Sequence, residues 1–377
     1  MGNCGEAYYW AYLTLTRAGI DRISFEKAKT FKSMDIPVTL EKPELSVLIF
    51  AHDRKAYLKK AIESVLDQTL DRTKYEIIVV KNFRDIEIDA LMAKEKVTSV
   101  FAENTNYGDD IMTSVKLSSA EIVCFLEDDD YYCRDKLETV LDEFQRNPKL
   151  GYYHHSEFVI DSEGKVLSHQ KVREDYTVDL KFNIFSMSSG LLREYILSRG
   201  NGNPSMMAIR KSVLAGLSEF IKNFKSPEYF ISFAALISGL DVHVNSRKLT
   251  YYRVHSSESL KFWNDEESFI KWFLASNVTM YNVFTRILDM VKGTKLQNMA
   301  IMERSAYKVL IYIFGGGETF KPTKRDIALF LKSKSFHNRM PNAIPAVILS
   351  ALWILFPKRA YRFYFKRHRK MASTMIS

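Results

Sequence analysis

Four consecutive carboxylates stand directly after a run of apolar residues. Glu127-Asp128-Asp129-Asp130 follows residues 121–126 (EIVCFL), a run that is typical of a buried strand. Adjacent carboxylates repel one another, and hard oxygen ligands of this kind bind Mg²⁺ or Mn²⁺. A solvated acidic turn is the alternative interpretation. The position at a strand end, rather than on an exposed helix face, favours a cation site that could bridge a diphosphate.

Polar groups also follow three further apolar runs. Strands are predicted at 45–50, 75–80 and 97–101, and plausible helices separate them. This alternation indicates βαβ units and an α/β fold with a mostly parallel central sheet. Ligands of such sheets bind beyond the carboxyl ends of the strands. The groups expected to meet there are His52-Asp53-Arg54, Lys81-Asn82, Glu103-Asn104 and Glu127 to Asp130.

The second half of the chain has a less regular pattern. We expect a hairpin over 151–170 with a turn at Glu163-Gly164, a helix over 227–239, and two short strands within 242–254. Beyond Ser259 the pattern is helical. Four regions are therefore predicted, namely a helical N-terminal extension over 1–44, the α/β domain over 45–260, a helical extension over 261–340, and a tail over 341–377.

Composition and charge exclude several classes of protein. The chain has 377 residues, of which 46% are apolar and 26% charged, as in ordinary globular proteins. Three cysteines, Cys4, Cys124 and Cys133, form no CxxC pair and no disulfide framework, which indicates a reducing compartment. The net charge of +9 comes largely from residues 357–377, which hold seven basic residues and no acidic one. Because the rest of the chain is nearly neutral, a nucleic-acid partner is not expected.

The predicted tail has two parts. An apolar run of 14 residues, 343–356, includes Trp353 and precedes a basic and aromatic stretch. The run is too short to span a bilayer, but the combination suits a helix lying in a membrane interface. A core helix followed by a solvated charge run is the alternative. No secretion signal precedes the domain. We therefore predict a cytoplasmic protein, peripheral to the inner face of the cell membrane.

The stretch from Leu45 to about Leu260 resembles the inverting nucleotide-sugar glycosyltransferases of family 2, which have the Rossmann-like GT-A fold. The resemblance rests on LSVLIFAHDRKAYLKKAIESVLDQT at 45–69, on EIIVV at 76–80, and on FLEDDDYYCRDKLE at 125–138. The last of these matches the Asp-x-Asp motif of the family. The resemblance implies a divalent metal, Mn²⁺ or Mg²⁺, and a nucleoside-diphosphate sugar as donor.

Carried over residue by residue, the resemblance gives each acidic residue a role. Asp129 is implied as the metal ligand and Asp130 as a supporting carboxylate. Glu127 is implied to face the ribose or sugar of the donor, and Asp128 is implied to take part in binding the nucleotide-sugar. The residues implied to contact the nucleotide are Ala51, His52, Asp53, Arg54 and Asn82.

Two later segments match further elements of the family. In PEYFISFAALISG, residues 227–239, Glu228 occupies the position of the general base, at a helix start where a negative charge is also stabilised. Its task would be to deprotonate an acceptor hydroxyl. The YRVH stretch at 252–255 implies a phosphate-facing Arg253 and a metal-binding His255.

The chain departs from the family pattern at three places, and one is the Gly-rich stretch before the third helix, of which only Asn106-Tyr107-Gly108 remains. Lys81 stands where an acidic residue usually reads the nucleobase, and a lysine cannot accept a hydrogen bond, so Asn82 is expected to take part instead. Pro227 replaces the first acid of the base motif. A polyprenyl-phosphate sugar synthase and a non-catalytic sugar- or nucleotide-binding scaffold are therefore alternatives. A metal-dependent nuclease is not favoured because the domain lacks a basic face.

The sequence as a whole predicts an inverting, metal-dependent hexosyltransferase-like enzyme. It would transfer a sugar to a hydroxyl of a glycan or lipid-linked acceptor at the membrane surface, with the tail over 341–377 as the membrane contact.

Overall fold

The structure is a computed structural model that describes residues 42–52, 54–102, 106–167, 178–198, 200–221, 224, 226–254, 265–333 and 366. Every described residue belongs to the unit Lys42–Ser377. The predicted N-terminal helices therefore lie outside the described residues, as do the apolar run at 343–356 and the site residues Asp53 and His255.

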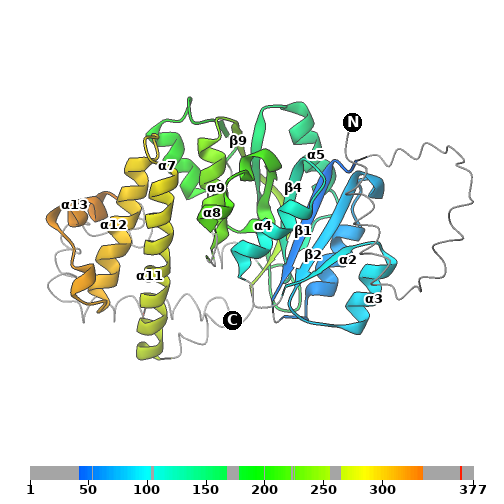
Figure 1. Cartoon of the computed structure of the whole chain (residues 1–377), viewed down its shortest axis with the longest axis horizontal. Helices are drawn as coiled ribbons and strands as arrows, with labels where there is room; N and C mark the ends of the chain where they lie inside the picture. Colours follow the sequence, from blue (N-terminus) through cyan, green and yellow to red (C-terminus); the bar gives the residue numbers. More distant parts are fainter. Residues whose placement is uncertain are drawn as a thin grey trace, which may run out of the picture. The chain divides into compact units, whose positions relative to one another are not determined.

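Four parallel strands form the first half of the sheet (Figure 1). They are β1 (Leu45–Ala51), β2 (Tyr75–Lys81), β3 (Thr98–Phe101) and β4 (Ile122–Glu127), in the order β3-β2-β1-β4. These strands agree with the predicted runs to within one or two residues. Their carboxyl ends lie at one edge of the sheet, because β1 pairs in parallel with both β2 and β4.

The second half of the sheet is mixed. Its strands are β5 (Tyr131–Tyr132), β6 (Leu150–Ile160), β7 (Leu180–Phe182), β8 (Met207–Arg210) and β9 (Asp241–Arg253). Strand β8 runs antiparallel to β4 and β6, whereas β6 and β9 are parallel. The expectation of a mostly parallel sheet is wrong for this half, because β8 enters beside β4 from the opposite direction.

The prediction of two short strands within 242–254 is also wrong, because β9 is continuous over 13 residues. Its pairing with β6 shifts register between His154 and Ser156 and again between Ser156 and Glu157. The first part of β9 also pairs with β7, and its end pairs with β5. Strand β9 therefore changes its second partner along its length, from β7 to β5.

Helices cover both faces of the sheet. Along β1, Leu45, Val47 and Ile49 belong to one core cluster, and Leu48 and Phe50 belong to the other, as the alternation of a strand requires. The first cluster includes side chains of α2 (Leu58–Leu66), α3 (Ile86–Lys94) and α5 (Lys136–Arg146). The second includes α4 (Tyr107–Leu117) and α9 (Pro227–Ile237), whose helical prediction is confirmed.

The remaining described helices follow or flank this core. They are α7 (Ser189–Leu197), α8 (Ser218–Ile221), α11 (Glu266–Met290), α12 (Gln297–Ile313) and α13 (Lys324–Lys332), together with the 3₁₀ turns η3 (Arg72–Lys74), η4 (Pro204–Met206), η5 (Lys211–Leu214) and η6 (Glu318–Phe320). Helix α11 packs on α8 and α9, and α12 packs on α11 and α13 (Figure 1). Within the described ranges no helix has the length and hydropathy needed to cross a membrane.

Candidate active site

Three carboxylates converge just beyond β4. Glu127 is the last residue of this strand, and its carboxylate, with those of Asp129 and Asp130, offers oxygen atoms that all lie within 4.8 Å of one another. Burial raises the pKa of Glu127 well above its usual value, and the charge of Asp130 adds to this shift. Such a cluster of partly desolvated oxygens fits the ligand set of a hard divalent cation.

Asp128 is not one of these three carboxylates and pairs with Arg54. The guanidinium donates to both carboxylate oxygens of Asp128, through Nη2 to Oδ1 and through Nε to Oδ2 at 3.3 Å. Its Nη1 also lies 2.6 Å from Oδ2 of Asp129. Burial raises the pKa of Asp128 to about 7, although the charge of Arg54 opposes the shift. One arginine thus compensates part of the negative charge of the loop.

Asp130 is fixed by β9 and η4. Its Oδ1 accepts the backbone N–H of Arg253 at 2.9 Å, and its Oδ2 accepts from the side-chain amide of Asn203 at 3.5 Å. Burial and the charge of Asp129 raise the pKa of Asp130 to about 7. Asp130 is therefore held rigidly at the base of the cluster.

The Arg253 side chain supports the loop through main-chain carbonyl groups. Its Nε donates to the carbonyl of Asp129 at 2.9 Å, and its Nη1 donates to the carbonyls of Asp161 at 2.9 Å and Ser162 at 2.8 Å. The guanidinium carbon lies 4.2 Å from the ring centroid of Tyr57. The contacts of Arg253 in this structure thus hold protein groups in place, and contact with a phosphate stays a prediction.

A buried lysine lies behind the acidic loop. Nζ of Lys136 donates to the carbonyl of Ser205 at 2.6 Å and to Oγ1 of Thr250 at 3.2 Å, and it lies 3.4 Å from the ring centroid of Tyr132. Oγ of Ser205 in turn accepts the backbone N–H of Glu127 at 3.0 Å. Burial lowers the pKa of Lys136 to about 7. This chain of hydrogen bonds ties the end of β4 to η4 and β9.

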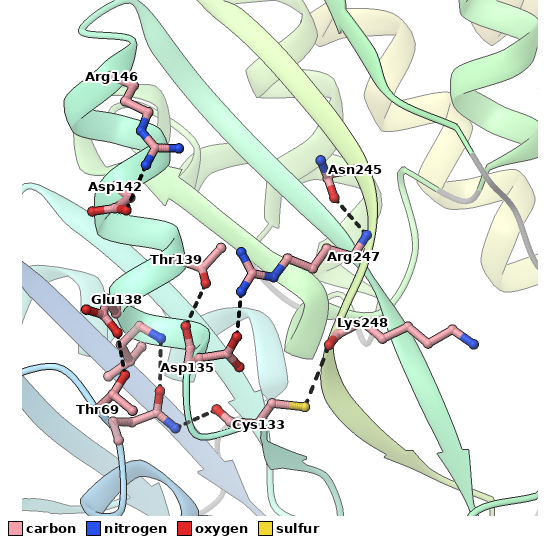
Figure 2. Close-up of polar contacts among 12 residues, drawn as sticks. Thr69, Cys133, Asp135, Glu138, Thr139, Asp142, Arg146, Asn245, Arg247 and Lys248 are labelled. Carbon is pink, nitrogen blue, oxygen red and sulfur yellow. Dashed lines mark hydrogen bonds and ion pairs between the residues drawn. The ribbon is translucent and has the colours of Figure 1, made fainter.

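Further polar contacts anchor the segment that follows the loop, as Figure 2 shows. Oγ1 of Thr69 donates to Glu138 at 2.7 Å, and Nη2 of Arg247 donates to Asp135 at 2.6 Å. Sγ of Cys133 lies 3.8 Å from the carbonyl of Lys248. These contacts join the start of α5 to β9 and to the turn after α2, and so hold in place the chain that directly follows the acidic loop.

A cavity of about 370 Å³ opens beside the loop. Its volume is in the range of small-molecule sites. Nε2 of His52 forms a hydrogen bond with the buried carboxylate of Asp110, in the first turn of α4. The residues that line the cavity are Phe50, His52, Arg54, Asn106, Tyr107, Glu127 and Asp128.

Glu228 lies in the first turn of α9, next to this charge cluster. Pro227 occupies the start of the helix, where its missing N–H costs nothing. Burial raises the pKa of Glu228 to about 7. Its charge also contributes to the raised pKa of Glu127, so the two carboxylates are close enough to interact. Their arrangement places a carboxylate that can exchange a proton near neutral pH beside a possible cation site.

Comparison with known proteins identifies the domain. Residues 46–216 match the family described as Glycosyl transferase family 2. Three curated relatives are uncharacterized glycosyltransferases. The one from Nostoc sp. is 31% identical over 131 residues, 33% of this chain and 39% of that protein. The one from Haemophilus influenzae is 23% identical, and the match covers 57% of this chain and 70% of that protein. The one from Rickettsia bellii is 29% identical, and the match covers 42% of this chain and 23% of that protein. The chain therefore spans less than two thirds of the length of the Nostoc and Rickettsia relatives.

The segment over residues 46–216 belongs to glycosyl transferase family 2. S. aureus TarS 1-349 in complex with UDP-GlcNAc, a solved structure, has a TM-score of 0.50 and 15% identity over 88% of this chain and 91% of that chain. The same protein in complex with UDP gives a TM-score of 0.49 at 14% identity, over the same shares of the two chains. The first likeness supports a GT-A α/β fold, as the sequence predicts.

The structure brings together most of the predicted site residues. One loop carries the four predicted acidic residues, Glu127 to Asp130, and both Arg54 and Arg253 contact it. His52 lines the adjoining cavity. Ala51 is fully buried at the end of β1, and Asn82 follows β2. Lys81 is buried and paired with Asp89, with 2.8 Å between Nζ and Oδ1. The functional roles of all these residues stay predictions.

Sequence reasoning missed several residues of the site. Asp110, Asn203 and Ser205 contact predicted site residues or their backbone, and Lys136 reaches the site through its hydrogen bond to Ser205. Asp110 follows the Asn106-Tyr107-Gly108 stretch and could have been found as an acid in the first turn of a helix at the sheet edge. The positions of Asn203 and Ser205 carry no local signal, because η4 reaches the loop only through tertiary packing.

Proposed function

We propose that this family 2 domain is an inverting, divalent-metal-dependent glycosyltransferase that uses a nucleoside-diphosphate sugar. One observation carries the proposal: a carboxylate with a pKa of about 7, Glu228, interacts with a three-carboxylate cluster next to a cavity. This pairs a proton acceptor with a site for the cation that a diphosphate leaving group needs.

The cation would be Mg²⁺ or Mn²⁺, held by Glu127, Asp129 and Asp130. When bound, it supplies positive charge that stabilises the leaving diphosphate. Arg54 lines the same cavity and limits the repulsion between the carboxylates and an anionic donor. His255, which lies outside the described residues, stays a predicted additional ligand.

Glu228 would remove the proton of an acceptor hydroxyl as its oxygen forms a bond with the anomeric carbon. The bond between that carbon and the diphosphate oxygen breaks on the opposite face, so a single displacement inverts the configuration. The proton remains on Glu228 until solvent removes it. Since the pKa of Glu228 is about 7, about half of the molecules carry an ionised Glu228 at neutral pH.

A calorimetric titration tests the donor site. Purified protein would be titrated with UDP, GDP, TDP and CDP, each with and without Mn²⁺, and with UDP-GlcNAc, because one TarS structure contains that compound. We expect metal-dependent binding of one nucleotide, and loss of that binding in Asp129→Asn. If the folded protein binds none of these nucleotides, the donor-site proposal is wrong and a binding scaffold becomes the better interpretation.

Glu228→Gln then separates two classes of acceptor. A hydroxyl acceptor needs its proton removed, so turnover should fall by about 10²- to 10⁴-fold. A polyprenyl phosphate is already ionised, so the same variant would retain nearly full turnover. We propose a hydroxyl of a glycan or of a lipid-linked glycan as the acceptor, with the enzyme at the cytoplasmic face of the membrane.

A further inference from the structure

Tyr107 is held firmly at the start of α4. Asn106 caps the helix, because its side-chain oxygen accepts the backbone N–H of Asp109 at 3.1 Å. The edge of the Tyr107 ring packs against Phe50, with 5.2 Å between centroids and 77° between planes. At Gly108 any Cβ would lie 2.3 Å from the carbonyl oxygen of Ile221, so only glycine permits this approach of α4 to α8.

The hydroxyl of Tyr107 is buried and has no hydrogen-bond partner among the described residues. A buried donor without an acceptor costs about 1–3 kcal/mol, so such a group invites an explanation. The ring lines the cavity beside the acidic loop. Four carboxylates are close enough to act on the phenol electrostatically, namely Glu127, Glu228, Asp128 and Asp129.

This environment keeps the phenol a proton donor. Burial, reinforced by the four negative charges, raises the pKa of Tyr107 well above its usual value, so the O–H bond persists at every pH at which the enzyme would work. None of the four carboxylates accepts this proton in the structure. The hydroxyl belongs to a ring that lines the cavity, and it lies within electrostatic reach of both the possible cation site and Glu228.

We propose that the Tyr107 hydroxyl binds a hydroxyl group of the donor sugar, which makes Tyr107 a donor-specificity residue. The inference rests on the proposed function and adds the contact that orients the transferred sugar. An uncharged sugar hydroxyl can accept from Tyr107 and donate to a neighbouring carboxylate at the same time. A phosphate oxygen suits the position less well, because it would meet several negative charges without a proton to share.

The test removes one oxygen atom and changes nothing else. Tyr107→Phe keeps the ring contact with Phe50 and deletes the hydroxyl. Tyr153→Phe is the matched control, because its hydroxyl is also buried and unpartnered among the described residues but does not line the cavity. Both full-length variants would be compared with the wild type by calorimetry with UDP and GDP, and by release of nucleoside diphosphate from UDP-glucose, UDP-galactose, UDP-GlcNAc and GDP-mannose.

We expect the affinity for the nucleoside diphosphate to stay unchanged in both variants. The kcat/KM for the best donor should fall about tenfold in Tyr107→Phe alone, the size expected for one lost hydrogen bond. Deoxy analogues of that donor sharpen the assignment. One of them should react equally with wild type and variant, because its missing hydroxyl is the one that Tyr107 binds.

Three results would overturn the inference, and they differ. If donor turnover in Tyr107→Phe equals that of the wild type while the nucleotide still binds, Tyr107 does not contact the sugar and the proposed function stands. If the wild type binds no nucleotide and splits no donor, the proposed function fails first and the inference with it. Loss of nucleotide binding in folded Tyr107→Phe would instead place the hydroxyl at the diphosphate.

Discussion

At the scale of single residues, Glu228 has the property that a general base needs. Burial raises its pKa to about 7, and the charged form is the one that can accept a proton. We therefore expect the transfer rate under kcat/KM conditions to rise with pH through about 7 and to fall about tenfold for each pH unit below it. Steady-state rates between pH 5 and 9, with the metal concentration held saturating, check this.

One variant and its control test whether Glu228 is the source of that pH profile. Glu228→Gln removes the rise and leaves a residual rate that does not vary through pH 7. Glu219→Gln is a matched control, since Glu219 also lies in the first turn of a helix but is exposed. If Glu228→Gln kept the wild-type profile, another group would be the base.

The residue scale also shows what a sequence can and cannot predict. Glu127, Asp128, Asp129 and Asp130 follow a recognisable apolar strand, so their place at the sheet edge could be predicted from local pattern alone. Asp110 pairs with His52 across 58 positions of the chain, and that pairing depends on how α4 docks on the sheet. Local patterns specify elements, whereas such contacts depend on tertiary packing.

At the scale of elements, the first half of the sheet could be predicted from local sequence pattern, whereas the second half depends on tertiary packing. Strands β1, β2 and β4 are buried on both faces and consist of nearly continuous apolar runs, which makes them easy to predict. Strand β9 carries a polar stretch in its middle, where the side chain of Asn245 accepts the backbone N–H of Arg247 at 2.7 Å. This local bond resembles a turn signal, so the sequence could not show that β9 continues through it (Figure 2).

Lys136 gives a prediction at this scale, because it ties α5 to η4 and β9. Burial lowers the pKa of this amine from 10.5 to about 7, so charging it opposes folding: stability falls as the pH drops from about 10.5 to about 7 and then levels off. Lys136→Met removes that cost along with two hydrogen bonds, so at pH 7.5 its unfolding free energy should lie within about 2 kcal/mol of the wild type. Because Ser205 then loses its restraint below Glu127, metal-supported nucleotide affinity should fall about three- to tenfold.

Calorimetry and denaturant unfolding on the same samples separate these effects. Lys149→Met serves as the control, since Lys149 is exposed and lies outside the site. An unchanged nucleotide affinity in a stable Lys136→Met protein would show that Lys136 supports the fold without positioning the acidic loop.

At the scale of the whole molecule, the acidic cluster links stability to pH and metal. Asp130 has a folded pKa of about 7 against a usual value of 3.8, so it adds stability below pH 4 that is lost as the pH rises through 7. A bound divalent cation would offset that loss. We expect Mn²⁺ to raise the melting temperature more at pH 8 than at pH 5.5, by several degrees at saturation.

Thermal scans with Mn²⁺, and again after addition of a chelator, check this expectation. Asp129→Asn should abolish the gain at pH 8, because it removes one oxygen ligand from the cluster. A gain of equal size at both pH values, or one that survives in Asp129→Asn, would place the cation elsewhere on the protein.

The tail over 341–377 gives the last prediction, which concerns the protein as a whole at a membrane. Apart from Lys366 this tail lies outside the described residues, and the prediction rests on its composition. Each basic residue near an anionic surface contributes about 1 kcal/mol, so neutralising four arginines should weaken binding to anionic vesicles by about 4 kcal/mol, roughly a thousandfold. The replacements to glutamine would be at Arg359, Arg362, Arg367 and Arg369.

A matched variant controls for net charge in the vesicle sedimentation assay that measures this. It carries glutamine at four exposed lysines of the described surface, namely Lys94, Lys116, Lys149 and Lys165. Binding to phosphatidylglycerol vesicles should survive in this variant and weaken as salt is added, because exposed charges are screened. If both variants lose binding equally, net charge alone governs it. If the tail variant still binds as the wild type does, these four arginines are not the membrane contact.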